Sequence, residues 1–435
     1  MKAYHAKQIY NIVLCGHSGA GKTSVAEAML RLSGATNRLG KVADGNTVCD
    51  YDPEEVRRGV SISTAVAPVE WKNKKLNLLD APGLFDFAGA AAEAMRAADS
   101  ALIVVSGKDS VSVGTEKAVA AAEARGLAKA FFVNGLCDES ARFYHVFEDL
   151  KAKFGPTVCP VVVPYIQDGQ ADIYINLLEY KAYDYKNGAP VEVPMPDMGD
   201  HRLAGLRTAI CEAVAETSDE MFEKYFSGEE FTPEEVIVGV SKGVKSGAIL
   251  PVFCGDALLM RGMEQFLDGL TWLLPSAADK AAEIGADIDG EPVELSVNEE
   301  GATAALCFKT IADPFVGKVS FLKCISGKVS QDDTLLDMRT GATEKIGKVV
   351  MMRGKKQEDM RVIPAGDIGA VLKLGGVATG DTLCAATRKV KLDGVDYPEC
   401  SLRMAIAPQT KGEEDKVAQA VARLMEEDPS IGFEN

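Results

Sequence analysis

A phosphate-binding pattern lies near the start of the chain. The residues from Gly16 to Thr23 read GHSGAGKT and fit G-x-x-x-x-G-K-[ST]. Glycines let backbone N–H groups approach a phosphate, Lys22 supplies positive charge, and Thr23 offers a hydroxyl to Mg²⁺. An apolar run precedes the pattern and a helical pattern follows it, whereas a chance glycine turn would lack that context. We predict nucleotide contacts from His17, Ser18, Gly19, Ala20, Gly21, Lys22, Thr23 and Ser24.

A second pattern, Asp80-Ala81-Pro82-Gly83, ends the apolar run from Leu76 to Leu79. A carboxylate at the end of a strand parallel to the phosphate-loop strand is placed to hold Mg²⁺ through water, and the N–H of Gly83 can approach a γ-phosphate. Alone, D-x-P-G is more often a plain turn, but its distance after the first motif favours function. We assign catalytic roles to Lys22, Asp80 and Gly83.

The elements that must position these residues form an α/β domain. Apolar runs alternate with helical patterns over about the first 150 residues, which is typical of βαβ units and a mostly parallel sheet. From about residue 155 to about 250 the sequence becomes acidic and rich in turns, which indicates an inserted subdomain. The α/β pattern resumes at Ile249 and ends at Pro275.

The remaining part of the chain has a different sequence pattern. From Ala302, short alternating runs are separated by Gly, Asp and Pro turns, which predicts an antiparallel β-barrel. A strand from Leu402 to Ala407 and a helix from Glu413 to Glu427 follow. They cannot bury their faces alone, so we expect this segment to be mobile, to pack on a neighbouring molecule or to lean on the barrel. We predict a P-loop domain at 1–276, a barrel domain at 277–396 and part of an α+β domain at 397–435.

Composition narrows the functional classes. The net charge of -17 argues against free DNA or RNA as an indiscriminate partner, although a local basic patch could still serve a ribonucleoprotein. We find no run of about 18 apolar residues and no signal-peptide pattern, so we expect a cytoplasmic protein without a membrane partner. The ten cysteines are scattered, and we read Cys15, Cys254, Cys307 and Cys324 as buried free thiols.

Several motifs together resemble elongation factor G in order and spacing. In the first domain they are RGVSI at 58–62, DAPG at 80–83, VGTEKA at 113–118 and CGDA at 254–257. The insertion resembles the extra subdomain of that factor, and DPFVGK, AGDIGAV and TGDTLC resemble its β-barrel second domain. EEDPS at 426–430 resembles a motif of its third domain, within which the resemblance stops. The fourth and fifth domains of the family have no counterpart here.

The resemblance implies a GTP-binding translation factor that works on the ribosome, with GTP or GDP and Mg²⁺ as ligands. It places Ser61 at the switch I position where the family has a threonine hydroxyl on Mg²⁺, although a solvated loop serine is the alternative. The implied metal site is therefore Thr23, Ser61 and Asp80. The implied base pocket contains Asn134, Cys137, Asp256 and Ala257.

Three departures from the family pattern weaken these implications. Gly19 stands where the family usually has aspartate, and Leu84 stands where it has histidine. The guanine motif N-K-x-D reads Asn134-Gly135-Leu136-Cys137, so the guanine-reading aspartate is replaced by cysteine. Asp138 comes one residue late and could substitute only if the loop shifts register. We therefore expect slow GTP hydrolysis and a reduced preference for guanine.

Three functional hypotheses remain open from the sequence. The first is a guanine-nucleotide switch acting in elongation or translocation on the ribosome. The second is a degenerate module that binds nucleotide or ribosome with little hydrolysis, or a factor of the ribosome-protection type. The third is a P-loop enzyme for another nucleotide such as ATP, motivated by the weakened guanine motif.

Overall fold

The computed structural model describes residues 4–167, 170–186, 188–196, 202–313, 316–400, 402–410 and 412–434. Its first part is a seven-stranded sheet in the order β2-β3-β1-β4-β5-β11-β6. These strands are β1 (Ile9–Cys15), β2 (Ala65–Trp71), β3 (Lys74–Asp80), β4 (Ser100–Ser106), β5 (Ala128–Asn134), β6 (Val158–Pro160) and β11 (Leu250–Cys254). The pairings of this sheet are parallel, except that β2 and β3 are antiparallel.

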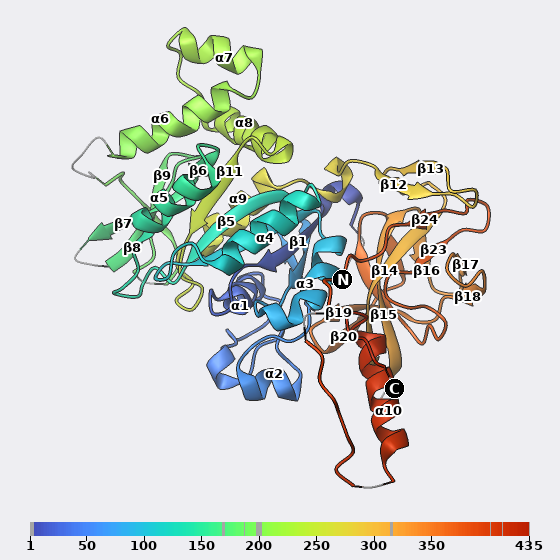
Figure 1. The fold of residues 1–435 in the computed structure, drawn as a ribbon. Helices are drawn as coiled ribbons and strands as arrows, with labels where there is room; N and C mark the ends of the chain where they lie inside the picture. The colour runs from blue at the N-terminus through green and yellow to red at the C-terminus, as the bar shows by residue number, and fades with distance from the viewer. Residues whose placement is uncertain are drawn as a thin grey trace.

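Helices surround this sheet (Figure 1). They are α1 (Lys22–Leu32), α3 (Ala88–Ala97), α4 (Val113–Ala124), α5 (Phe143–Phe154) and α9 (Met263–Leu273). The short helix α2 (Pro53–Arg58) lies apart from the sheet, below it in Figure 1, and short 3-10 turns lie at Ala6–Gln8, Val42–Asp44, Phe85–Phe87 and Ala277–Asp279. Every residue of β1 is buried, as expected for a parallel strand covered on both faces. The carboxyl ends of the parallel strands meet at one edge, which brings the loops after β1, β3, β5 and β11 together.

The expected insertion is a subdomain of its own. Its antiparallel sheet has the order β10-β9-β8-β7, built from β7 (Val162–Gln167), β8 (Gln170–Asn176), β9 (Lys181–Asp184) and β10 (Val191–Val193). Three helices follow, α6 (Arg202–Ala215), α7 (Asp219–Phe226) and α8 (Pro233–Ser246). Local chemistry explains α8, because Thr232 and Glu235 form a capping box, Pro233 opens the helix and Gly247 ends it at φ 79°.

The second half is β-rich, as predicted. Its main antiparallel sheet runs β18-β17-β23-β14-β15-β22-β19-β20, beside the smaller sheets β13-β12-β24 and β16-β21. The strands are β12 (Glu283–Ala286), β13 (Pro292–Leu295), β14 (Ala304–Asp313), β15 (Gly317–Ser326), β16 (Lys328–Ser330), β17 (Thr334–Asp337), β18 (Thr343–Lys345), β19 (Val349–Arg353), β20 (Lys356–Asp359), β21 (Val362–Pro364), β22 (Ile368–Leu372), β23 (Thr382–Cys384) and β24 (Lys391–Leu392). The four cysteines expected to be buried free thiols are buried and unpaired.

The C-terminal segment corrects one expectation. Residues 402–408 form no strand, because no strand among the described residues lies alongside to share hydrogen bonds. The helix α10 (Glu414–Glu427) leans on the barrel (Figure 1). Glu427 Oε1 accepts a hydrogen bond from the N–H of Ala312 at 2.6 Å, and Lys318 pairs with Glu426 at 2.5 Å. None of the helices in the described ranges combines the length and apolarity needed to cross a membrane.

A buried ion pair joins the barrel to the first domain. Lys75 of β3 donates to both carboxylate oxygens of Asp367 at 2.7 and 2.8 Å, and both side chains are at most 2% exposed. Asn77 donates to the same carboxylate at 2.9 Å, and the N–H of Ile368 does so at 2.8 Å. Together with the buried pair of Lys323 and Asp99, this pair holds the two domains against each other.

We predict that Asp367→Ala destabilises the protein by about 3 to 5 kcal/mol, because it leaves the Lys75 ammonium buried without a partner. Thermal unfolding of the two proteins measures this as a drop of several degrees. Asp359→Asn, at an exposed ion pair with Lys348, is the matched control and is expected to leave the unfolding temperature nearly unchanged. Equal effects of the two variants would contradict the prediction.

Candidate nucleotide-binding site

The loop from Gly16 to Gly21 connects β1 to α1 and folds around its own lysine. Lys22 Nζ donates to the carbonyl oxygens of Gly16 at 3.2 Å and His17 at 3.0 Å, and the residue is 6% exposed. Gly21 caps α1 at φ 90°, in the left-handed region that favours glycine, and a Cβ there would collide with the side chain of Asn134. The unpaired N–H groups of the first turn of α1, which contains Ser24, therefore face the same space as the ammonium.

The three residues predicted to hold a metal lie together. Thr23 Oγ1 donates to Asp80 Oδ2 at 2.8 Å and lies 3.3 Å from Ser61 Oγ. Ser61 Oγ in turn donates to Asp50 Oδ1 at 2.7 Å. The four side chains come from the phosphate loop, the end of β3 and the segment 40–63, which we call switch I.

The cluster suits a hard divalent cation. Asp80 Oδ1 is buried and lacks a hydrogen-bond partner among the described residues. Burial, and next the charge of Asp50, raise the pKa of Asp80 to about 7. Carboxylate and hydroxyl oxygens are the ligands that Mg²⁺ prefers. No group of three or more His, Cys, Asp and Glu side chains in the described ranges could hold a metal alone. A P-loop site differs, because phosphate oxygens supply several ligands.

Sequence reasoning missed the carboxylates that shape switch I. Glu27 of α1 accepts from the N–H groups of Gly40 at 3.1 Å and Val48 at 2.5 Å. Glu55 accepts from the N–H groups of Ile62 at 2.9 Å and Ser63 at 3.1 Å. Burial is the main cause that raises the pKa of Glu27, Glu55 and Asp50. The sequence signal for these carboxylates was weak, because Asp50 and Glu55 lie in a charged stretch that resembles a solvated surface.

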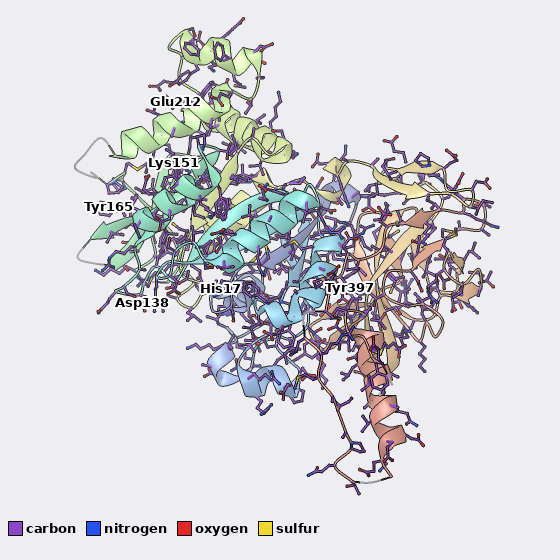
Figure 2. The ribbon with its side chains drawn as sticks, viewed as in Figure 1. His17, Asp138, Lys151, Tyr165, Glu212 and Tyr397 are labelled. Carbon is purple, nitrogen blue, oxygen red and sulfur yellow. The ribbon has the colours of Figure 1, made fainter. Side chains whose placement is uncertain are left out.

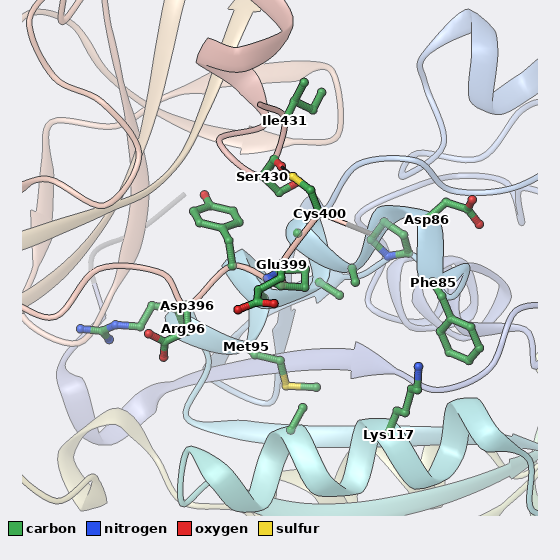
Figure 3. Close-up of a pocket in the computed structure, with 18 of the residues that line it drawn as sticks. Phe85, Asp86, Met95, Arg96, Lys117, Asp396, Glu399, Cys400, Ser430 and Ile431 are labelled. Carbon is green, nitrogen blue, oxygen red and sulfur yellow. Dashed lines mark hydrogen bonds between the residues drawn. The ribbon is translucent and has the colours of Figure 1, made fainter. Parts of the chain in front are cut away.

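Gly83 lies against the phosphate loop. A Cβ on this residue would lie 2.8 Å from the backbone nitrogen of Ser18 and would collide with Lys22 Nζ. Leu84 follows as the cap of the turn Phe85–Phe87, and Lys117 Nζ lies 4.0 Å from the centre of the Phe85 ring. Figure 3 shows Lys117 pointing from α4 toward that ring. The structure thus brings Lys22, Asp80 and Gly83 to one place.

The predicted base-side residues also lie together. Asn134, at the end of β5, donates through Nδ2 to the carbonyl of Ala20 at 3.1 Å and accepts through Oδ1 from the N–H of Ala257 at 3.1 Å. The N–H of Cys137 donates to Asp256 Oδ2 at 3.2 Å. Because β5 and β11 are adjacent parallel strands, their following loops form one wall beside the phosphate loop.

The thiol at position 137 is neutral. Arg261 Nη1 donates to its sulfur at 3.4 Å, and burial, then the charge of Asp256, raise the thiol pKa to about 11. Arg261 also pairs with Asp172 of β8, so the inserted subdomain borders the pocket. Sequence reasoning missed both residues, because they lie far from the motifs along the chain.

Asp138, the alternative to Cys137, has other partners. Its carboxylate accepts from the N–H of Ser140 at 3.0 Å and pairs with Lys108 at 2.5 Å. Figure 2 shows Asp138 beyond the end of β5 and His17 at the phosphate loop. These contacts hold the Asp138 carboxylate at the exposed surface of the loop.

Three family models match the chain in order along the sequence. They are the Elongation factor Tu GTP binding domain at residues 7–276, Elongation factor G domain 2 at 302–386 and Elongation Factor G, domain III at 397–435. The chain belongs to the elongation factor G-like translational GTPases. The predicted fold class, a P-loop α/β domain followed by a β-barrel domain and part of an α+β domain, is confirmed.

One solved structure shares this architecture. It is the crystal structure of ttk003000868 from Thermus thermophilus, which is 31% identical to this chain with a TM-score of 0.88. The match covers 99% of this chain and 62% of that one. This elongation factor G-like chain therefore spans 62% of the length of the protein it matches.

We predict that Gly83→Ala weakens a non-hydrolysable GTP analogue about ten- to a hundredfold and changes GDP affinity little. The added Cβ pushes the backbone away from Ser18, which removes a hydrogen bond to the γ-phosphate that GDP lacks. Calorimetric titration measures both affinities. Gly375→Ala is the matched control, since its Cβ would meet nothing within 4 Å. Equal losses for the two nucleotides would show that the variant damages the whole loop instead.

Proposed function

We propose that this chain binds GTP and GDP with Mg²⁺ and works as a slow GTPase switch on the ribosome, in the cytoplasm. The observation that carries the proposal is the chain of contacts Thr23–Asp80 and Thr23–Ser61–Asp50, which joins the phosphate loop to switch I. Membership of the translational GTPases supports the guanine nucleotide and the ribosome as partners. The domain boundaries 1–276, 277–396 and 397–435 are part of the same proposal.

Each side chain has a distinct task in this proposal. Lys22 and the N–H groups of the loop bind the β- and γ-phosphates, and Gly83 offers its N–H to the γ-phosphate. Thr23, Ser61 and Asp80, with Asp50 behind Ser61, hold Mg²⁺. When bound, the cation would supply positive charge that offsets the negative charge developing on the phosphates during transfer. Loss of the γ-phosphate removes what holds Ser61 and Gly83 against the loop, so both segments are released.

A second candidate is a nucleotide-binding module with little hydrolysis. The observation that favours it is Leu84, an apolar side chain at the position that the resemblance assigns to a water-positioning histidine. Its neighbour Phe85 is 47% exposed, and the ammonium of Lys117 lies over one face of the ring. A charged lysine has no acceptor, so Lys117 cannot take a proton from an attacking water. The two candidates share the binding site and differ in turnover.

The first test concerns the phosphate site. Lys22→Ala is expected to abolish detectable GDP binding, because charge-assisted hydrogen bonds to phosphate are worth about 1.5 to 3 kcal/mol each. Isothermal calorimetry with Mg²⁺ present measures the effect. Lys151→Ala, at an exposed lysine of α5, serves as control and should bind GDP as the wild type does. A Lys22→Ala variant with wild-type affinity would refute the P-loop assignment.

The second test concerns hydrolysis. Single-turnover assays with and without ribosomes are expected to show slow wild-type hydrolysis, and Leu84→His should accelerate it, since a positioned polar group of this kind contributes about 10² to 10⁴ in rate. Leu84→Met keeps the volume without a polar group and should stay slow. Wild-type turnover as fast as that of the histidine variant would mean that another residue positions the water.

A further inference from the structure

The chain that follows the barrel, from residue 397 to residue 430, is attached to α3 at two places. At its start, the hydroxyl of Tyr397 donates a hydrogen bond to Oε1 of Glu93 at 2.9 Å. At its end, the turn after α10 packs on the first turn of α3, where a Cβ on Gly89 would lie 2.9 Å from Oγ of Ser430. The segment 397–430 therefore rests on the helix that follows the Gly83 loop.

Glu93 is the buried charge at this attachment. The residue is 2% exposed, and its ion-pair partner in the described ranges, Lys309 of β14, lies 3.9 Å away, which is too long for a hydrogen bond. The Lys309 ammonium donates to Ser63 of switch I instead. A second carboxylate, Asp428 of the turn after α10, is close enough to repel the charge of Glu93. An ionised Glu93 is therefore poorly compensated in the attached state.

These surroundings favour the protonated form of Glu93. Burial is the largest cause and Asp428 adds to it, whereas Lys309 and Tyr397 oppose it, and together they raise the pKa of Glu93 from 4.5 to about 7. When the segment leaves α3, water reaches the carboxyl and the pKa falls back toward 4.5. The attached state thus binds a proton that the detached state releases. Attachment is strongest below pH 4.5 and weakens as the pH rises through about 7.

We propose that Glu93 is a proton-operated latch, which holds the segment 397–430 on α3 while its carboxyl is protonated and loosens the segment when the carboxyl ionises. Lys309 keeps the latch within reach of neutral pH, because without its charge Glu93 would retain the proton to higher pH. The thiol of Cys400 donates to the carbonyl of Ser430 at 3.0 Å, so the two attachments are joined and are released together. The latch needs no bound nucleotide and goes beyond the proposed function.

Hydrogen–deuterium exchange of the nucleotide-free wild-type protein at pH 6 and pH 8 tests the latch, after correction for the intrinsic pH dependence of amide exchange. Peptides from the turn after α10 report on it, because the N–H groups of Ser430 and Ile431 donate to Asp428 within that turn. Protection is expected to be about tenfold higher at pH 6, since one group with a pKa of about 7 changes the attachment by about that factor over this range. Equal protection at the two pH values, or none at either, would overturn the proposal.

Three variants locate the proton. Glu93→Gln keeps the shape of the side chain and cannot ionise, so its protection is expected to be the same at both pH values. Tyr397→Phe removes a hydrogen bond that lowers the pKa of Glu93, so the midpoint of the pH profile is expected to move upward, which a purely structural role of the tyrosine would not cause. Glu116→Gln, at an exposed ion pair with Lys153, is the matched control and should keep the wild-type profile. A tenfold pH effect that persists in Glu93→Gln would assign the proton to another group and overturn the proposal.

Discussion

The burial of Asp80 against Thr23, with Asp50 and Lys22 nearby, is the constraint on which the rest of the site depends. Burial makes ionisation of Asp80 costly, since its pKa rises from 3.8 to about 7, a cost of about 4 kcal/mol at 1.4 kcal/mol per pKa unit. Because the pKa of Asp80 is higher in the folded than in the unfolded protein, the contribution of the protonated side chain to folding stability is full below pH 3.8. It is lost as the pH rises through about 7. A cation at Asp80 Oδ1 would offset that loss at neutral pH.

The β-barrel domain contacts both switch I and α3. Lys309 of β14 is buried, donates to Ser63 of switch I and lies 3.9 Å from Glu93 of α3, the helix that follows Gly83. Burial raises the pKa of Glu93 to about 7, which the Lys309 charge opposes, and Tyr397 donates to Glu93 at 2.9 Å. Movement of Ser63 would remove a partner from a buried cation, which is costly. Lys309 therefore joins the second domain to switch I and to α3.

The sequence predicted the functional residues that lie in contiguous motifs, and it missed those that only the folding of the chain brings together. The phosphate loop and the end of β3 are short motifs whose flanking apolar runs identify their strands, so their meeting at one sheet edge followed from parallel pairing. Asp50, Asp172 and Arg261 come from three separate segments of the chain, and no periodicity marks them. Strand β6 has only three residues, too few to show a period, while 402–407 shows alternation but has no neighbour to pair with among the described strands. A pattern predicts that a strand is able to form, whereas pairing requires a partner in space.

Two of the three departures from the family pattern, Cys137 and Leu84, fall at the base end and the γ-phosphate end of the proposed nucleotide site, and the third, Gly19, lies in the phosphate loop. In the proposed binding mode, Cys137 borders the base and Leu84 the γ-phosphate. Lys22 would bind the phosphates, and Thr23 and Asp80, which are hydrogen-bonded to each other, would hold Mg²⁺. Affinity for a nucleoside polyphosphate comes largely from charge-assisted bonds to phosphate, so it survives changes at either end. On the proposed function, base discrimination would depend on an acceptor at position 137 and hydrolysis on a polar group at position 84. Because the two positions lie in different loops, selectivity and turnover could change independently while the phosphate site is kept.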